Sequence, residues 1–381
     1  MLSIFCAPAR YVQGRNATVA LGDEMKKLGL PGPVFVLAGN HARTLLANTW
    51  DATFKGAGYK YLVEAFKGEC SSNEIARCKK LASEFGAKVV IGAGGGKVLD
   101  TARAVASELD LPVVNCPTLA SSDAPCSALS VVYTESGEFQ EYKFYKRNPD
   151  LVLVDTSVIA RGPARLLVAG MGDALATWFE AKTVREAHKA NQVGGKTTIS
   201  ADALAALCYQ TLLNDGVAAL HAVQNQVVTP ALERLVEANT LLSGLGFESG
   251  GLAVAHSVHN GLTAVPETHI YYHGEKVAFG LLVQLVLEGQ PSKHIDEVLN
   301  FSESVGLPIC LQDLGVYSLS KEQLAKIAER ATAPGETCHN EPFEVKADMI
   351  ADAIQSADSI GMTFRALNPD SSSNEYCASI N

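Results

Sequence analysis

The sequence lacks the basic runs expected of a nucleic-acid-binding protein. Its 31 Lys and Arg stand against 41 Asp and Glu, the formal net charge is −10, and no Lys/Arg-rich run occurs. Because binding to nucleic-acid phosphates needs a basic face, we expect no nucleic-acid partner. An anionic cofactor is not excluded, since backbone N–H groups can bind phosphate locally.

The chain also lacks an apolar run of about 18 residues, so we expect no transmembrane helix and no membrane partner. The stretch from Met1 to Arg15 has no long apolar segment, and a secretory signal peptide is therefore not expected. The same stretch has no acidic residue, which leaves an organellar targeting signal open.

Cysteine motifs are missing as well. The nine cysteines are odd in number and widely spaced, and none forms a Cys-x-x-Cys pair. A disulfide framework and a Cys₄ zinc site are thereby disfavoured, and reduced thiols in a cytoplasmic protein are expected. No Gly-x-Ser-x-Gly sequence occurs, so the nucleophile elbow of a serine hydrolase is not present.

What is present in residues 1–160 is an alternation of apolar runs and helical stretches. The runs are Val34–Ala38, Lys88–Gly92, Pro112–Asn115 and Leu151–Asp155, with helices expected at Asn73–Phe85 and Lys97–Leu109. Buried strands that alternate with helices are typical of a parallel α/β sheet. Leu129–Tyr133 and Phe139–Tyr145 flank Glu-Ser-Gly and predict an added hairpin.

Residues 161–381 have a different texture. Stretches rich in Ala, Leu and Glu with a 3.6-residue period predict helices throughout, for example Pro163–Glu186 and Glu275–Glu288. We therefore predict two domains, an α/β dinucleotide-binding domain over 1–160 and an all-helical domain over 161–381. The polar end from Asn368 to Asn381 is expected to be poorly ordered, and its role is open.

The segment Val89–Thr101 predicts a phosphate-binding turn. It reads as a strand, three consecutive glycines (Gly94, Gly95 and Gly96) and the start of a helix. Glycines let backbone N–H groups approach a pyrophosphate, and the helix N-terminus favours negative charge. The turn does not match Gly-x-Gly-x-x-Gly, because Lys97 or Leu99 stands where the third glycine would be. It does not match a Walker A loop either, because Val98 follows Lys97. A tight turn without a ligand is the alternative.

A carboxylate and several histidines are candidate metal ligands. Asp173 follows Gly172, where it suits either a ligand or a helix cap near a helix N-terminus. His256 and His259 lie at i and i+3 on one expected helix face, and His273 begins the next long helix. Two imidazoles and one carboxylate form a common open catalytic metal set, although ordinary structural histidines would give the same pattern.

Six segments together resemble the glycerol dehydrogenases, a branch of the iron-containing alcohol dehydrogenase superfamily. They occur in one order along the chain: Gly94–Thr101, Pro117–Ser130, Gly172–Trp178, Gly246–Gly251, His256–Thr263 and His273–Phe279. The similarity runs from about Tyr11 to Phe364. It implies an N-terminal α/β cofactor domain, a helical domain and an active site in the cleft.

The resemblance also implies site residues. One zinc ion per subunit would be held by Asp173, His256 and His273. Asp123 and His256 would be catalytic, with Asp123, His256, His259 and Phe247 towards the substrate. The NAD site would comprise Asn40, Gly94, Gly95, Gly96, Lys97, Val98, Leu99, Asp100, Thr118, Leu119, Ala120, Ser121, Ser127, Leu129 and Tyr133.

Asn40 departs from the pattern of the resembled family, which tends to carry Asp there. A carboxylate after this strand accepts a hydrogen bond from the ribose 2′-hydroxyl of NAD and repels the 2′-phosphate of NADP. Asn does neither as strongly, so we expect the preference for NAD over NADP to be modest.

The function implied is NAD-dependent oxidation of glycerol and related vicinal diols to dihydroxyacetone or its analogues. Zinc would assist alkoxide formation, and hydride would pass to nicotinamide. A dehydroquinate-synthase-like NAD/zinc cyclase and a non-catalytic NAD-binding sensor remain as alternatives. The resemblance further implies a cytoplasmic homo-oligomer, often an octamer, acting on a small polyol.

Overall fold

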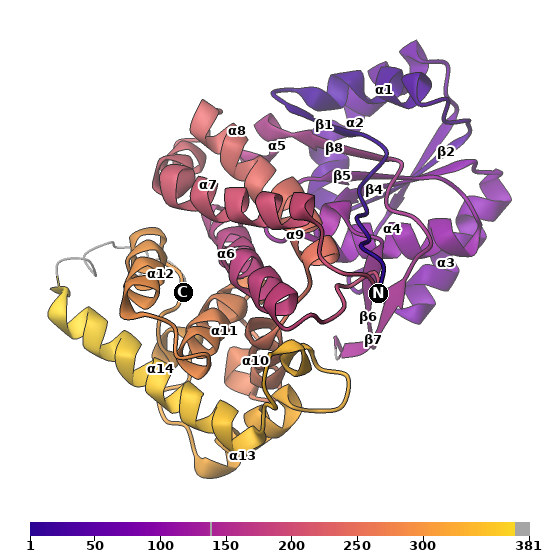
Figure 1. Cartoon of the computed structure of the whole chain (residues 1–381). Coiled ribbons are helices and arrows are strands. Elements are labelled where there is room, and N and C mark those ends of the chain that lie inside the picture. The colour runs from indigo at the N-terminus through magenta and orange to yellow at the C-terminus, as the bar shows by residue number, and fades with distance from the viewer. Residues whose placement is uncertain (138, 370–381) are drawn as a thin grey trace. The chain divides into compact units, whose positions relative to one another are not determined.

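The computed structural model describes residues 1–137 and 139–369 (Figure 1), so most of the chain end discussed above lies outside the described residues. Backbone contacts divide the chain into two compact units. We call Cys6–Pro163 with His221–Gly244 the sheet unit. Met1–Phe5, Ala164–Leu220 and the chain from Leu245 onward form the helical unit. The predicted boundary at residue 160 lies close to the one at Pro163, and each unit also contains a segment from the other predicted domain.

The sheet unit is built on six parallel strands in the order β1-β8-β5-β4-β2-β3. These are β1 (Tyr11–Gly14), β2 (Val34–Ala38), β3 (Tyr61–Ala65), β4 (Val89–Gly94), β5 (Val113–Pro117) and β8 (Leu151–Asp155). The antiparallel hairpin β6 (Leu129–Tyr133) and β7 (Phe139–Phe144) forms a separate sheet. The predicted parallel sheet and the hairpin are both confirmed.

Both faces of the large sheet are covered, because successive side chains of a strand point to opposite faces. Val34 and Val36 of β2 join one core with Trp50. Phe35 of β2 joins the other core with Ile75. The helices of this unit are α1 (Leu21–Lys27), α2 (Asn40–Gly56), α3 (Ser72–Phe85), α4 (Gly96–Glu108), α5 (Thr156–Ile159) and α8 (Pro230–Glu237), with 3₁₀ turns η1 (Ala17–Ala20) and η2 (Ala124–Cys126) and the π-helical turn η3 (Ala238–Leu242).

The strand order places a topological switch point between β2 and β4. From β2 the chain proceeds to β3 on one side of β2 and then returns to β4 on the other side. In open α/β sheets, ligands bind beyond the carboxyl ends of the strands at such a point. The residues that follow β2 and β4 are Gly39 and Gly95, so Asn40 and the predicted phosphate turn both lie at this edge.

The helical unit is centred on α11 (His273–Leu287), which is buried over most of its length. It packs against α6 (Ala164–Glu186), α10 (Val254–Leu262), α12 (Ser292–Val305) and α14 (Ala347–Leu367). The unit also contains α13 (Lys321–Ala331) and most of α7 (Ile199–Gln224) and α9 (Ser243–Gly250). Helices α6, α10 and α11, which bear the candidate metal ligands, lie side by side (Figure 1). The prediction of a helical second part is confirmed.

Helix α7 has the length and hydropathy to cross a membrane, and it is the single described helix that does. Of its most apolar 18-residue window, 44% is buried inside the protein. A core helix of a soluble protein passes the same test, so one such helix is weak support for a membrane span.

Candidate functional site

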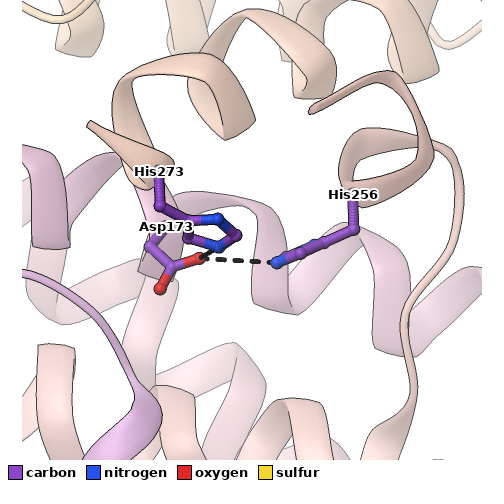
Figure 2. Close-up of side chains that lie close together, drawn as sticks. All are labelled: Asp173, His256 and His273. Atoms are coloured by element: carbon purple, nitrogen blue, oxygen red, sulfur yellow. Dashed lines mark ion pairs between the residues drawn. The ribbon is translucent and has the colours of Figure 1, made fainter. Parts of the chain in front are cut away.

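Asp173, His256 and His273 come together in the helical unit (Figure 2). The Nε2 atom of His273 lies 3.1 Å from Asp173 Oδ1, and the Nε2 atom of His256 lies 3.5 Å from the same oxygen. Their ligand atoms all fall within 4.8 Å of one another. Asp173 is fully buried, whereas the His273 side chain is 40% exposed, so the set opens to solvent on the His273 side. These three residues, assigned as metal ligands from the sequence, are thus brought into one cluster.

Backbone-to-backbone contact between helices produces this convergence. Beside Asp173, a Cβ atom on Gly172 would lie 2.3 Å from the carbonyl oxygen of Gly274. Beside His273, a Cβ atom on Gly274 would lie 1.7 Å from the carbonyl oxygen of Ala169. Only glycine permits α6 and α11 to cross this closely. Asp173 therefore lies in the middle of α6, and the interpretation of this residue as a helix cap is wrong.

A second close crossing brings α10 to α11. A Cβ atom on Gly280 of α11 would lie 2.3 Å from the carbonyl oxygen of Ala255, the neighbour of His256. Each of the three candidate ligands is thus adjacent in sequence to a point where two helix backbones touch. The ligand spacing is set by backbone packing, with little freedom left to the side chains.

Glu180 orients the His256 ring through the nitrogen that faces away from Asp173. Its Oε2 atom accepts a hydrogen bond from His256 Nδ1 at 2.7 Å, and its Oε1 atom accepts from the backbone N–H groups of Ala253 and His256. Such a carboxylate fixes the tautomer in which Nε2 carries the lone pair, and it raises the basicity of the ligand. The sequence analysis missed Glu180, although it lies seven residues after Asp173 and so two turns along the same helix face.

His259 supports His273 in the same way. Its Nε2 atom lies 3.0 Å from His273 Nδ1, and its own Nδ1 atom lies 3.0 Å from Asn260 Oδ1. In the neutral tautomers, His273 donates to His259 and His259 donates to Asn260, which leaves Nε2 of His273 facing Asp173. His269, in contrast, is exposed and hydrogen-bonds the carbonyl of Thr263, outside the cluster.

The charges and the burial of the cluster shift the pKa values of its members. Burial would raise the pKa of Asp173, but the adjacent His273 and His256 rings hold it well below its usual range. Burial would lower the pKa of His256, but the Glu180 and Asp173 carboxylates raise it well above the usual value. Burial, together with the charge of His273, lowers the pKa of His259. Asp173 is thus an anion and His259 a neutral ring at neutral pH.

In the sheet unit, the glycine turn forms a backbone cradle. Gly95 is the N-cap of α4, and no side chain caps the first turn of this helix. A Cβ atom on Gly94 would lie 2.6 Å from Val98, whereas one on Gly96 would meet nothing nearer than 3.8 Å. Gly94 therefore serves the strand–helix packing, while Gly95 and Gly96 leave the helix N-terminus open to an anion.

The other candidate cofactor residues cluster beyond β4 and β5. Thr118, Leu119, Ala120 and Ser121 follow β5 directly, and Leu129 and Tyr133 bound β6. Lys97 forms an ion pair with Glu69 and lies 5.6 Å over the Tyr133 ring. The side chains of Val98, Leu99, Asp100 and Ser127 are buried, with Asp100 paired to Arg103. A ligand at this edge would meet backbone groups more than those four side chains.

Asn40 begins α2 at the carboxyl end of β2 and is exposed. The guanidinium of Arg43, one turn later and also exposed, reaches to 3.5 Å from Asn40 Oδ1. The surface at the end of β2 therefore carries a neutral amide and a positive guanidinium. An Asp at position 40 would place a negative charge there instead.

Asp123 lies in the sheet unit, immediately before η2, and its side chain is 8% exposed. Its Oδ2 atom accepts a hydrogen bond from the buried Ser243 hydroxyl at 2.9 Å. Phe247 belongs to α9 in the helical unit and is 5% exposed. Among the described residues, neither belongs to the cluster of three candidate ligands.

Glu341 is a further buried acid, and no sequence pattern singled it out. It is 2% exposed, and neither carboxyl oxygen makes a hydrogen bond within the described residues. Burial, with the nearby Glu288 and Glu180 carboxylates, raises its pKa to about 9. Glu341 is therefore protonated in the folded protein at neutral pH.

Comparison with known proteins identifies relatives along nearly the whole chain. Residues 8–156 match the family model described as iron-containing alcohol dehydrogenase. A glycerol dehydrogenase of Pseudomonas putida is 51% identical over 94% of this chain and 98% of its own. A glycolaldehyde reductase of Halobacterium salinarum is 47% identical over 96% of this chain and 100% of its own.

The chain is also similar to a solved structure over nearly its whole length. The crystal structure of glycerol dehydrogenase from Schizosaccharomyces pombe matches with a TM-score of 0.92 and 40% sequence identity. The match covers 96% of this chain and 93% of that one. At this identity, the similarity extends beyond the fold to the family.

The close crossing of α6 and α11 yields a first prediction. Gly274→Ala should push the two backbones apart, because the new Cβ atom would lie 1.7 Å from Ala169 O. We expect a loss of roughly 1–3 kcal/mol in unfolding free energy, as for overpacked cores, and a loss of bound metal as Asp173 and His273 separate. Metal content after reconstitution and the thermal unfolding midpoint measure the two effects.

The matched control is Gly56→Ala. Gly56 ends α2, and a Cβ atom there would contact nothing within 4 Å. This variant should keep its metal and gain slightly in stability, because alanine is the better helix former. A Gly274→Ala protein with the parent's metal content and unfolding midpoint would contradict the prediction.

The protonated state of Glu341 yields a second prediction. The folded pKa of about 9 exceeds the ordinary value of 4.5, so the folded protein retains a proton that the unfolded chain releases. The unfolding free energy contributed by this group is therefore fully present below the ordinary pKa and is lost as pH rises towards 9.

Glu341→Gln stays neutral at every pH and removes this dependence. Relative to the parent, the variant should become more stable by roughly 1 kcal/mol or more as the buffer is changed from about pH 5 to about pH 8. Urea unfolding of the parent and the variant at both pH values gives the difference in their unfolding free energies. The contributions of the other titrating groups largely cancel in this difference. A difference that stays constant with pH would show that Glu341 is ionised in the fold.

Proposed function

This chain belongs to the glycerol dehydrogenase branch of the iron-containing alcohol dehydrogenase family, and we propose that it oxidises glycerol and related vicinal diols with NAD and one zinc ion per subunit. The proposed product from glycerol is dihydroxyacetone. Its relatives show that the chain is an oxidoreductase. The observation that supports metal-dependent oxidation of a diol is the cluster of Asp173, His256 and His273.

The chemistry of this donor set suits a divalent ion such as zinc. It offers one buried carboxylate oxygen and two imidazole Nε2 atoms, and three protein ligands leave positions for substrate oxygens. When bound, the metal supplies a Lewis acid that favours loss of the substrate hydroxyl proton. Glu180 and His259 fix the rings of His256 and His273, so both Nε2 atoms face the same point.

The edge of the sheet suits a dinucleotide. The open N-terminus of α4, reached through Gly95 and Gly96, can bind a pyrophosphate through backbone N–H groups. A dinucleotide held there would supply the hydride acceptor for the carbinol carbon. Asn40, which begins α2 at the carboxyl end of β2, would accept a hydrogen bond from the ribose.

Two residues are proposed to face the polyol. The Asp123 carboxylate, held by Ser243, would accept a hydrogen bond from the hydroxyl next to the reacting carbon and so favour vicinal diols. Phe247 would give an apolar wall. For His259, the hydrogen bond to His273 supports a role in orienting the metal ligand over direct contact with substrate.

Reduction of an α-hydroxyaldehyde is a second candidate function, favoured by the glycolaldehyde reductase relative. It is the same hydride transfer in the opposite direction, on a substrate that also carries a hydroxyl beside the reacting carbon. The cyclase and the sensor give no net NADH, so steady NADH formation with glycerol separates the dehydrogenase from both. The kcat/KM values for glycerol oxidation and glycolaldehyde reduction then decide between the two dehydrogenase substrates.

The family resemblance also supports a homo-oligomer, in the resembled proteins often an octamer, and the odd number and wide spacing of the cysteines support a cytoplasmic location. Sedimentation of the purified protein tests the oligomer.

Dependence on a metal is the third prediction. Dialysis against a chelator should abolish turnover of glycerol, and zinc should restore it, because the bound ion would supply the Lewis acid that favours loss of the hydroxyl proton. His273→Ala should retain little zinc, since two protein ligands rarely hold the ion. Metal analysis and NADH absorbance are the measurements. Full activity in a preparation verified to be free of metal would refute the proposed chemistry.

The fourth prediction concerns cofactor choice at the end of β2. Asn40 and Arg43 lack the negative charge that repels a 2′-phosphate, so turnover with NADP should be measurable. Asn40→Asp should raise the NAD-to-NADP ratio of kcat/KM by on the order of tenfold, as expected for one charge-assisted hydrogen bond. Arg43→Ala should weaken binding of NADPH more than that of NADH, measured by fluorescence titration.

The ratio before substitution serves as the reference for both variants. If Asn40→Asp and Arg43→Ala leave the NAD-to-NADP ratio unchanged, the end of β2 does not face the ribose, and the assignment of Asn40 to the cofactor site fails.

A further inference from the structure

A π-helical turn in the sheet unit lies against the Asp123 loop. Helix α8 and the segment Ser243–Gly250 are continuous except for η3, where the chain makes one wide turn. Such wide turns are rare in α-helices and frequently mark functional sites. All residues of this turn except Leu241 are buried, as are Ser243 and Gly244 just after it, and the turn approaches the loop 120–127.

Three contacts join the turn to the loop. Asn239 donates from Nδ2 to the carbonyl oxygen of Ala120 at 3.0 Å. Ser243 donates from Oγ to Asp123 Oδ2 at 2.9 Å. A Cβ atom on Gly244 would lie 3.0 Å from the carbonyl oxygen of Asp123, so the two backbones nearly touch.

Side chains other than Ser243 hold the backbone of the loop. The buried Arg103 guanidinium donates to the carbonyl oxygens of Ala124 and Ser127, and Asn115 donates to the carbonyl oxygen of Pro125 at 2.8 Å. With Asn239, these side chains tie down four carbonyl groups. The Ser243 hydroxyl, in contrast, donates to the carboxylate of Asp123.

From this division of contacts we infer that Ser243 is a positioning residue, which orients the Asp123 carboxylate towards the second hydroxyl of a vicinal diol. The inference rests on the proposed function of Asp123. A hydroxyl that donates to one carboxylate oxygen fixes the rotation of the group and satisfies part of its hydrogen-bonding capacity. Specificity for diols over simple alcohols then depends on Ser243 through Asp123.

A double-mutant cycle tests the inference. Ser243→Ala should lower kcat/KM for glycerol by about tenfold, the size expected for loss of a hydrogen bond to a charged group. Asp123→Asn should lower it by at least as much. In the Asp123→Asn background, Ser243→Ala should add less than about a twofold loss, because residues that act through one another are not additive.

The substrate pair butane-2,3-diol and butan-2-ol provides the specificity measurement, since the two differ only in the second hydroxyl. Ser243→Ala should lower the ratio of their kcat/KM values by about tenfold, whereas general damage to the fold would lower both values and leave the ratio unchanged. The Kd for NADH should not change. Ser243→Cys, a weaker donor of similar shape, replaces Ser243→Ala if the latter does not fold.

Ser302→Ala is the matched control. Ser302 is a buried serine of α12 in the helical unit, and its hydroxyl makes no hydrogen bond within the described residues. Its removal should leave the substrate ratio unchanged.

The possible outcomes distinguish failure of the proposed role of Asp123 from failure of the inferred role of Ser243. If glycerol is oxidised and Asp123→Asn has no effect, the proposed role of Asp123 is wrong and the inference falls with it. If Asp123→Asn is impaired but the loss from Ser243→Ala is equally large in both backgrounds, the role of Asp123 stands and the inference alone is overturned.

Discussion

The contact between helix backbones at Gly172, Gly274 and Gly280 is the constraint on which the candidate metal site depends. The three candidate ligands come from helices separated by many residues of sequence, and side-chain rotamers alone could not hold their atoms at a common distance. Asp173 and His273 are instead each next in sequence to a glycine, and His256 is next to a residue that contacts one. At each of these glycines there is no room for a Cβ atom. Glu180 and His259 then fix ring orientation, which is a smaller correction on a geometry already set.

Much of this architecture could be predicted from the sequence, and the failures have physical causes. The fully buried strands β2 and β8 are continuous apolar runs, and both were predicted with their correct bounds. The edge strands β1 and β3 were missed, because they are only half buried and carry polar residues. The wide turn η3 could not be anticipated, since Ala238–Leu242 is as helical in composition as its flanks.

The site shows a similar division. Asp173, His256 and His273 were identified from residue type and family resemblance, and the fold brings them together. Glu180, Arg103 and Ser243 were not identified, because each acts on a functional group or loop far away in sequence, and local patterns do not report such pairs. The carboxyl ends of β2 and β4 were placed correctly, since a parallel sheet puts them on one edge.

The exposure of Asn40 and Arg43 has an evolutionary consequence. Both side chains lie on the surface at the start of α2, where substitution disturbs no core packing. The glycines at the helix crossings tolerate no such exchange. On the proposed function, substitutions at Asn40 and Arg43 would change the coenzyme preference while the helices that bear the candidate metal ligands stay fixed, so coenzyme preference should be the more labile trait of the lineage.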